Sequence, residues 1–259
     1  MGGPLNLGFL TRKREPLPEI WRFGDVDWPL VLTRRPGTRR ITLRLCAVSD
    51  TLRIVAPPRT SLTEIRRIVD QHAAALETQA RNLPPRIAFA DGATLPYLGQ
   101  TLRIAQGSGL RNAWSETSEG PLLTVGGRPE HLARRVRDAL IRQAEAELNT
   151  AVADAFATAQ SFKPRPVAAI RIGDTRGRWG SCASDGTLRF SWRIVLSPPE
   201  ILRYLAAHEV AHLAEMNHSP RFWQVVAAID PNAKPARAWL KRHGAGLHRI
   251  GPPLRGKGV

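Results

Sequence analysis

Three histidines and two glutamates fall within eleven consecutive positions of the sequence, in the stretch HEVAHLAEMNH at residues 208–218. In an α-helix each residue turns by about 100°, so His208 and His212 lie on one face, one turn apart. His218 would point away from both if the helix continued, because six further residues rotate its side chain by about 240°. The three histidines can therefore meet only if the helix ends before His218 and the chain turns back.

The residues after the second histidine carry the signals for such an end. Asn217 tolerates the left-handed backbone conformation of a helix end. Ser219 and Pro220 are typical of the N-cap and the first position of a new helix, PRFWQVVAAI. We therefore expect a break at Met216 and Asn217 that swings His218 toward the other two histidines.

Two imidazoles one helical turn apart can bind the same metal ion, and His-Glu-x-x-His on a helix is the sequence form of this arrangement. Glu209 lies beside them and suits a carboxylate that accepts a proton from a metal-bound water rather than binding the metal. Three neutral histidines and a water would complete a tetrahedral zinc site with one open position. We expect one Zn²⁺ per chain, held by His208, His212 and His218, with Glu209 as the general base of a hydrolase.

Two neighbouring residues and one alternative bear on this site. Glu215 returns to the same helical face as His212; it could be the third ligand in place of His218, but we favour a role in which it accepts a hydrogen bond from an imidazole and orients that ring. Tyr204 precedes His208 by one turn and is expected to pack beneath the site. The alternative is a buried helix without metal, in which each histidine would need a hydrogen-bond partner in the core.

The composition narrows the class of protein. Hydrophobic residues make up 42% and charged residues 23% of the 259 positions, which is typical of a soluble globular chain. No window of about 18 apolar residues could span a membrane. The first residues carry a basic cluster after their apolar residues, the reverse of a secretory signal, and Cys46 and Cys182 build no disulfide framework. We expect a cytoplasmic protein.

Basic residues exceed acidic ones by 38 to 22, which gives a net charge of +16. Such an excess attracts polyanions, so nucleic acid or another polyanion is a candidate partner. The basic residues are scattered rather than gathered in one block, however, and solvated arginines encoded by a GC-rich genome explain the same excess. His243 and His248, in the basic segment KRHGAGLHRI, are likewise expected to be solvated.

Periodicity and turn signals organise the rest of the chain. The predicted elements are strands in a meander over 28–55, further strands at 93–106 and 121–125, and helices over 62–83 and 129–159. Asp185 and Gly186 predict a hairpin, and two prolines at 198 and 199 open the helix that carries the histidines. The fold class is therefore α+β, with a β-rich N-terminal half joined by the long helix to a mixed C-terminal half.

The segment GRWGSCASDGTLRFSWRIVLSPPEILRYLAAHEVAHLAEMNHSPRFW resembles the YgjP-like metallopeptidase family, which is related to the SprT-like and WLM metallopeptidases, all of them zincins. The residues that carry the resemblance fall in the family's order and spacing: Arg178 to Cys182, Gly186, Trp192, the proline pair, Tyr204 and the three histidines. The segments RRITLRLCAVSDTLRIVAP, LPYLGQTLRI and ARAWLKRHG extend it over most of the chain. Ser191 departs from the pattern, which has asparagine there.

This resemblance implies a zinc peptidase with His208, His212 and His218 as ligands and Glu209 as general base. The stretch GGRPE marks a loop near residues 126–130, where we expect the two halves to join. The expected division is an N-terminal tail (1–25), a β-rich subdomain (26–128), a zincin-like metallopeptidase domain (129–250) and a C-terminal tail (251–259).

The segment RGRWGSC precedes the metal helix and admits two interpretations. Its strand can line the cleft, pair with an extended peptide and place Arg178 near a developing oxyanion. Alternatively, Gly177 and Gly180 permit tight turns while Trp179 and Cys182 only pack. Cys182 as a fourth metal ligand has no support from its spacing.

Three functional hypotheses compete. The leading one is a zinc-dependent peptidase acting on peptides or proteins. The second keeps the zinc but cleaves a nucleoside triphosphate or another phosphoanhydride, against which stands the absence of a phosphate-binding loop and of a carboxylate cluster for magnesium. The third is a non-catalytic basic module that binds nucleic acid. The resemblance to SprT-like proteins suggests a variant of it, a nucleic-acid-associated protease that acts on DNA-bound proteins. No oligomeric state is implied.

Overall fold

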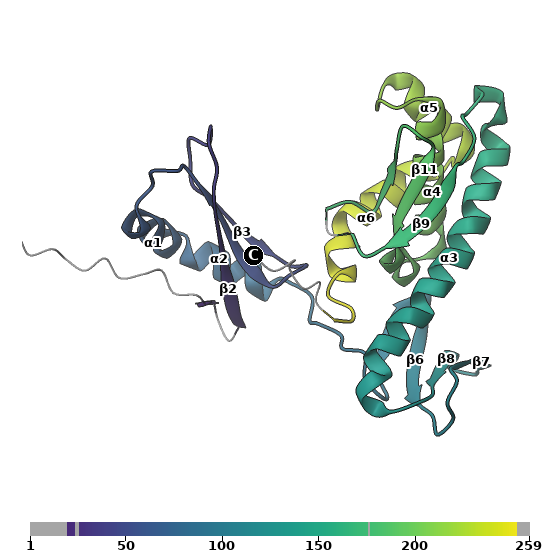
Figure 1. The fold of residues 1–259 in the computed structure, drawn as a ribbon, viewed down its shortest axis with the longest axis horizontal. Helices are drawn as coiled ribbons and strands as arrows, with labels where there is room; N and C mark the ends of the chain where they lie inside the picture. The colour runs from purple at the N-terminus through teal and green to yellow at the C-terminus, as the bar shows by residue number, and fades with distance from the viewer. Residues whose placement is uncertain (1–19, 24–25, 176, 253–259) are drawn as a thin grey trace, which may run out of the picture. The chain divides into compact units, whose positions relative to one another are not determined.

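The computed structural model describes residues 20–23, 26–175 and 177–252 and divides into two compact units (Figure 1). The first unit extends to Leu83 without the turn Ala47–Ser49, and the second comprises that turn and the chain from Pro84 onward. Most of both expected tails lies outside the described residues, although Ile20–Phe23, within the expected N-terminal tail, forms a strand.

The first unit is a four-stranded sheet packed on two helices. Its elements are β1 (Ile20–Phe23), β2 (Val26–Arg34), β3 (Thr42–Cys46), β4 (Thr51–Ala56), α1 (Leu62–Gln71) and α2 (Ala73–Arg81). Ser61 caps α1 by accepting a hydrogen bond from the backbone N–H of Glu64 at 3.1 Å. Apolar side chains of the sheet and helices, among them Trp28, Leu52 and Ile65, form its own core.

The sheet is not the expected meander, since its order is β1-β2-β4-β3 and β2 pairs with β4 in parallel. The long strand β2 pairs with β1 through its first half and with β4 through its second half, which leaves β3 at the edge. A period-two pattern indicates a half-buried strand but not its partner.

The second unit opens with a sheet of the same design. Its strands are β5 (Thr94–Tyr97), β6 (Gln100–Gln106), β7 (Ala113–Thr117) and β8 (Gly120–Val125), in the order β5-β6-β8-β7 with β6 and β8 parallel. As in the first unit, helical structure follows: η1 (Pro129–His131), α3 (Leu132–Thr158) and η2 (Ala159–Phe162). The same strand order followed by a helix thus occurs twice, a repeat that the sequence does not make evident.

The division after Leu83 differs from the boundary expected near residues 126–130. The loop there is real, but the apolar faces of β6 and β8 pack with α3 into a single core: Ile104, Leu123, Val136 and Leu140 are all fully buried in it. A loop marks the end of an element, whereas the burial of shared apolar surface defines a unit.

The remaining elements form a third sheet and a group of helices. They are β9 (Ala169–Gly173), β10 (Gly180–Cys182), β11 (Thr187–Ser191), η3 (Trp192–Leu196), α4 (Pro199–Ala214), α5 (Pro220–Ile229) and α6 (Ala233–Leu247). The expected hairpin joins β10 to β11, with Gly186 at φ +83° in its turn, and β10 lies at an edge of the sheet β10-β11-β9. Helix α4 contacts α3, α5, α6 and β10, so it lies at the centre of this unit.

The structure confirms the mixed α+β class, with a β-rich N-terminal half and helices dominating the C-terminal half. Among the described residues, none of the helices combines the length and the apolar character that crossing a membrane requires.

Candidate metal centre

Helix α4 carries the first two histidines, and its end determines where the third one lies. The helix begins at Pro199 and ends at Ala214, after which Glu215 adopts an extended conformation with φ −145° and ψ 108°. Ser219 then caps α5, its hydroxyl accepting a hydrogen bond from the backbone N–H of Phe222 at 3.3 Å. The helix therefore ends slightly before the expected break at Met216 and Asn217, and the new helix begins where the sequence predicts it.

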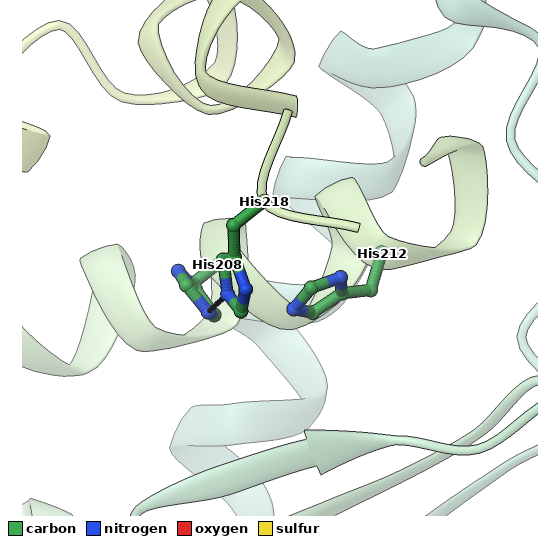
Figure 2. A group of neighbouring side chains, drawn as sticks. All are labelled: His208, His212 and His218. Atoms are coloured by element: carbon green, nitrogen blue, oxygen red, sulfur yellow. Dashed lines mark hydrogen bonds between the residues drawn. The ribbon is translucent and has the colours of Figure 1, made fainter. Parts of the chain in front are cut away.

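This change of direction brings the three imidazoles together (Figure 2). One ring nitrogen from each of His208, His212 and His218 lies within 4.8 Å of the other two. The Nε2 atoms of His208 and His218 are 3.2 Å apart. Two ligands on a tetrahedral zinc, each about 2.0–2.1 Å from the metal, are separated by roughly 3.3 Å, so this spacing fits a shared ion.

The protonation of the rings also fits a cation. The Nδ1 atom of His212 lies 3.1 Å from the backbone carbonyl oxygen of Glu215. A carbonyl only accepts, so Nδ1–H donates, and the other nitrogen of a neutral ring keeps its lone pair for a metal. Burial lowers the pKa of His208 to about 3, helped by the neighbouring histidines, and burial also lowers the pKa of His212. Neutral imidazole is the form that binds metals.

Glu215 therefore contacts His212 through its backbone rather than through its side chain. Its carboxylate instead accepts a hydrogen bond from the backbone N–H of Asn217 at 3.4 Å. Because α4 ends before it, Glu215 does not continue the helical face of the histidines as the sequence predicts.

Aromatic side chains enclose the cluster. The ring of Phe222 on α5 is centred 5.0, 4.4 and 4.7 Å from the rings of His208, His212 and His218. Trp223 stacks on His218, and Tyr204, 4% exposed, lies 5.9 Å from His208 by ring centroid. The position of Tyr204 matches the expectation, whereas the contacts of α5 with the rings have no signal in the sequence beyond its apolar periodicity.

Glu209 follows His208 on α4 and is buried, with 3% of its surface exposed. Its Oε2 atom has no hydrogen-bond partner within the described residues. Burial raises the pKa of Glu209 to about 8, an effect that the positive charge of Arg178 opposes. A buried carboxylate without a partner is costly, and such groups are concentrated at functional sites.

The backbone of β10 lies directly against this carboxylate. A Cβ atom at Gly180 would be 2.4 Å from Oε1 of Glu209 and 2.8 Å from its Cδ and Cγ atoms. Gly180 has no positive φ angle and lies within a strand, so the expected tight turn does not explain it. The glycine makes room for Glu209, a constraint that only the folded structure reveals.

Arg178 and Trp179 lie just before Gly180 and face different surroundings. Arg178 is exposed, and its backbone carbonyl accepts a hydrogen bond from the hydroxyl of Thr175 at 2.5 Å. Trp179 stacks on His248, with ring centroids 4.7 Å apart. Trp179 therefore packs, as the second interpretation of this segment holds. The expectation that His248 is solvated is wrong: it is 6% exposed, and burial lowers its pKa to about 4.

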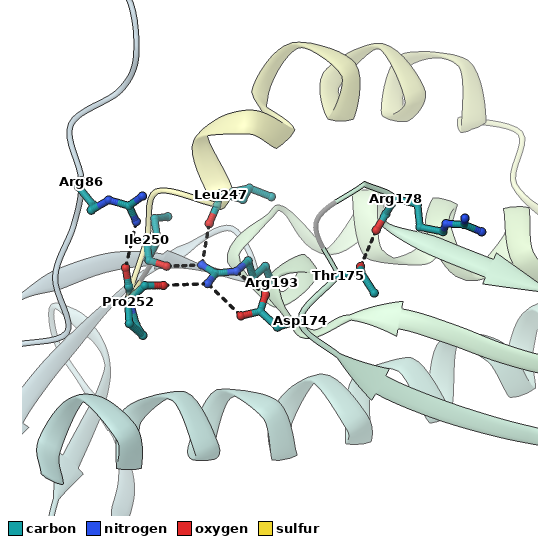
Figure 3. A network of polar contacts seen from close by, with 9 residues as sticks. Arg86, Asp174, Thr175, Arg178, Arg193, Leu247, Ile250 and Pro252 are labelled. Carbon is teal, nitrogen blue, oxygen red and sulfur yellow. Dashed lines mark hydrogen bonds and ion pairs between the residues drawn. The ribbon is translucent and has the colours of Figure 1, made fainter. Parts of the chain in front are cut away.

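A buried arginine fixes the base of this segment (Figure 3). Arg193 has no exposed surface and forms a two-point ion pair with Asp174, at 2.8 and 3.1 Å. Its remaining donors bind the backbone carbonyls of Leu247, Ile250 and Pro252. The loop after β9 and the chain at the end of α6 are thus held to one guanidinium, which anchors the start of the segment that leads to β10.

Comparisons with known proteins identify the family of this chain. The model of one protein family, described as the YgjP-like metallopeptidase domain, matches residues 39–243. The crystal structure of the metallopeptidase zymogen of Pyrococcus abyssi abylysin is similar at 27% identity, over 35% of this chain and 93% of that one, with a TM-score of 0.30. No curated protein matches. Since the family model covers well over half of the sequence, all three histidines included, the chain belongs to the YgjP-like metallopeptidase family.

Proposed function

We propose that this protein is a zinc-dependent peptidase in which His208, His212 and His218 hold the metal and Glu209 transfers the proton. The observation that carries the proposal is the convergence of three imidazoles, two of them on the helix that also carries the buried carboxylate of Glu209. Family membership supports peptide-bond hydrolysis, and the three-nitrogen donor set without a carboxylate is one that zinc favours.

The chemistry divides between the metal and the chain. A zinc ion bound by three imidazoles supplies a Lewis acid that lowers the pKa of water toward neutrality and polarises a carbonyl group. Glu209 accepts the proton of the attacking water and delivers it to the amine that leaves. Its burial against β10 limits the positions its carboxylate can take, which favours proton transfer along one path.

The chain also offers a surface for an extended peptide. Among the described residues, strand β10 pairs on one side with β11 and lies at the edge of its sheet, and it contacts α4, the helix that carries Glu209. An extended substrate can add to such an edge through main-chain hydrogen bonds. Arg178 is exposed next to this edge, and its positive charge acts to lower the pKa of Glu209. The same charge is suited to stabilise a developing oxyanion.

The test is the substitution Glu209→Gln, which removes the base but keeps the shape of the side chain. Purified variant protein should retain about one zinc per chain and lose about 10²–10⁴-fold in peptide hydrolysis, the range for general base catalysis. The matched control is Glu215→Gln, because Glu215 contacts His212 only through its backbone carbonyl. Equal activity of the Glu209→Gln variant and the parent would exclude the proposed role.

A further inference from the structure

A second polar site lies on α3, away from the histidines. A cavity of about 320 Å³ is lined by Arg111, Asn112, Arg134, Arg135, Asp138 and Arg142. These residues come from the loop between β6 and β7 and from the first half of α3, within the second unit. Helix α5 contacts η2, which follows the far end of α3, and Figure 1 shows β6 and β7 near one end of α3 and α5 near the other. The residues of the cavity and the histidine cluster therefore belong to different ends of that helix.

Arg135 holds the loop and the helix together. Its Nε donates to the side-chain oxygen of Asn112 at 3.1 Å, and its Nη2 donates to the carbonyl of Leu110 at 2.6 Å. Asn112 in turn donates from its amide to the backbone carbonyl of Arg135 at 3.3 Å. These bonds fix the backbone of the wall that carries Arg111.

Two glycines allow the same loop to close tightly. A Cβ atom at Gly126 would be 2.5 Å from the carbonyl oxygen of Arg111, and one at Gly127 would be 2.9 Å from Nη1 of Arg135. Gly127 also has φ +85°, and its N–H donates to the carbonyl of Gly109 at 2.7 Å. The loop therefore closes onto α3 in one preformed arrangement.

The charge in the cavity is unbalanced. Four guanidinium groups face a single carboxylate, that of Asp138, which already lies 3.5 Å from Arg134 and 3.0 Å from Arg137. Within the part of the chain that the structure describes, the side chains of Arg111 and Arg142 form no hydrogen bond or ion pair. Two exposed cations thus face the cavity without a partner, which favours an anion as its occupant.

We propose that this cavity binds the phosphate groups of a polyphosphorylated ligand. Guanidinium groups present parallel N–H donors that match phosphate oxygens, and several convergent arginines suit a compact group with more than one negative charge. The lining includes no aromatic side chain, so the cavity recognises phosphate rather than stacking on a base. The site is independent of the proposed zinc chemistry.

The test compares two variants that lose the same charge. Arg111→Gln with Arg142→Gln removes the two unpartnered cations of the cavity. The control is Arg171→Gln with Arg189→Gln. It removes two exposed arginines that lie opposite each other on the neighbouring strands β9 and β11. Both double variants should keep the parent's melting temperature. Binding of inorganic tripolyphosphate to the full-length protein is measured by calorimetry in about 0.15 M salt, where surface attraction is largely screened.

We expect the cavity variant to lose about tenfold or more in affinity for tripolyphosphate and the control less than about twofold, since only the former removes convergent charge-assisted hydrogen bonds. Polyphosphates chelate metals, but that contribution is the same in both variants, whose histidines are intact. A parallel titration with oligothymidylate identifies the source of the phosphate. If the cavity variant, and not the control, also loses affinity for oligothymidylate, nucleic acid is the source. Equal affinities in the two variants for both probes would overturn the proposal.

Discussion

Replacing Gly180 by alanine is the sharpest test of how the structure holds Glu209. The added Cβ would lie 2.4 Å from Oε1 of Glu209, whereas ordinary contact begins at 3.4 Å. The carboxylate must therefore move by about 1 Å or more, because β10 is held by its pairing with β11. The change leaves every proposed metal ligand in place.

The size of the effect follows from this displacement. A catalytic group moved by about 1 Å typically costs about 10²-fold in rate, so kcat should fall by that order while KM changes little. Crowding in a buried contact costs roughly 1–3 kcal/mol of stability, which a folded domain tolerates. The zinc content should stay at about one ion per chain, since the substitution is on β10, whereas the three histidines lie on α4 and in the turn before α5.

The assay measures kcat and KM on a peptide substrate beside zinc content by mass spectrometry. Gly177→Ala is the matched control, since it lies in the same segment and a Cβ there would meet nothing within 4 Å. Gly177→Ala should retain the parent's activity. If Gly180→Ala hydrolyses peptides within about twofold of the parent, or if both variants lose activity equally, the steric argument fails.

Three further predictions follow from the site. Chelation should abolish activity and lower the melting temperature, and added zinc should restore both, because an ion bound at about 1,000 times its Kd stabilises the folded state by about 4 kcal/mol. His218→Ala should bind zinc more weakly than the parent, as measured by competition with a chromogenic chelator, without unfolding, since its side chain is exposed. Burial lowers the pKa of His248 to about 4, so the residue stays neutral in the folded state between pH 7 and pH 5, whereas in the unfolded chain it is protonated below about 6.5. The contribution of His248 to the free energy of unfolding should therefore fall by about 2 kcal/mol over this range. Urea titrations of the His248→Phe variant should lack this pH dependence.

The parts of the fold that the sequence predicts are those with local signals. The cap at Ser61, the hairpin at Gly186 and the new helix at Ser219 each depend on residues within a few positions of one another. The spacing of the histidines adds a geometric requirement, that the helix must end, which the structure satisfies at Ala214. The family, too, is predicted correctly, because its motif lies in one continuous segment.

Other features depend on contacts between distant segments and leave no local signal. Gly180 meets Glu209, and Trp179 meets His248, only after the sheet and helices have packed. Likewise, the division into two units follows from whether the apolar faces of β6 and β8 are buried against α3, and no loop composition indicates that. In each repeated sheet the second and fourth strands pair in parallel, and the third strand lies at the edge. A period-two pattern does not specify that pairing.

The end of α4 is necessary for the three imidazoles to converge, but it is not sufficient. A free turn after Ala214 would allow His218 many positions, because that residue is exposed and follows several residues outside any helix. Phe222 restricts it, since one ring on α5 contacts all three imidazoles, and Ser219 sets where α5 begins. Apolar packing of a second helix thus completes a polar site, so its geometry should be more sensitive to the volume of the side chain at 222 than to the identity of the residues in the turn.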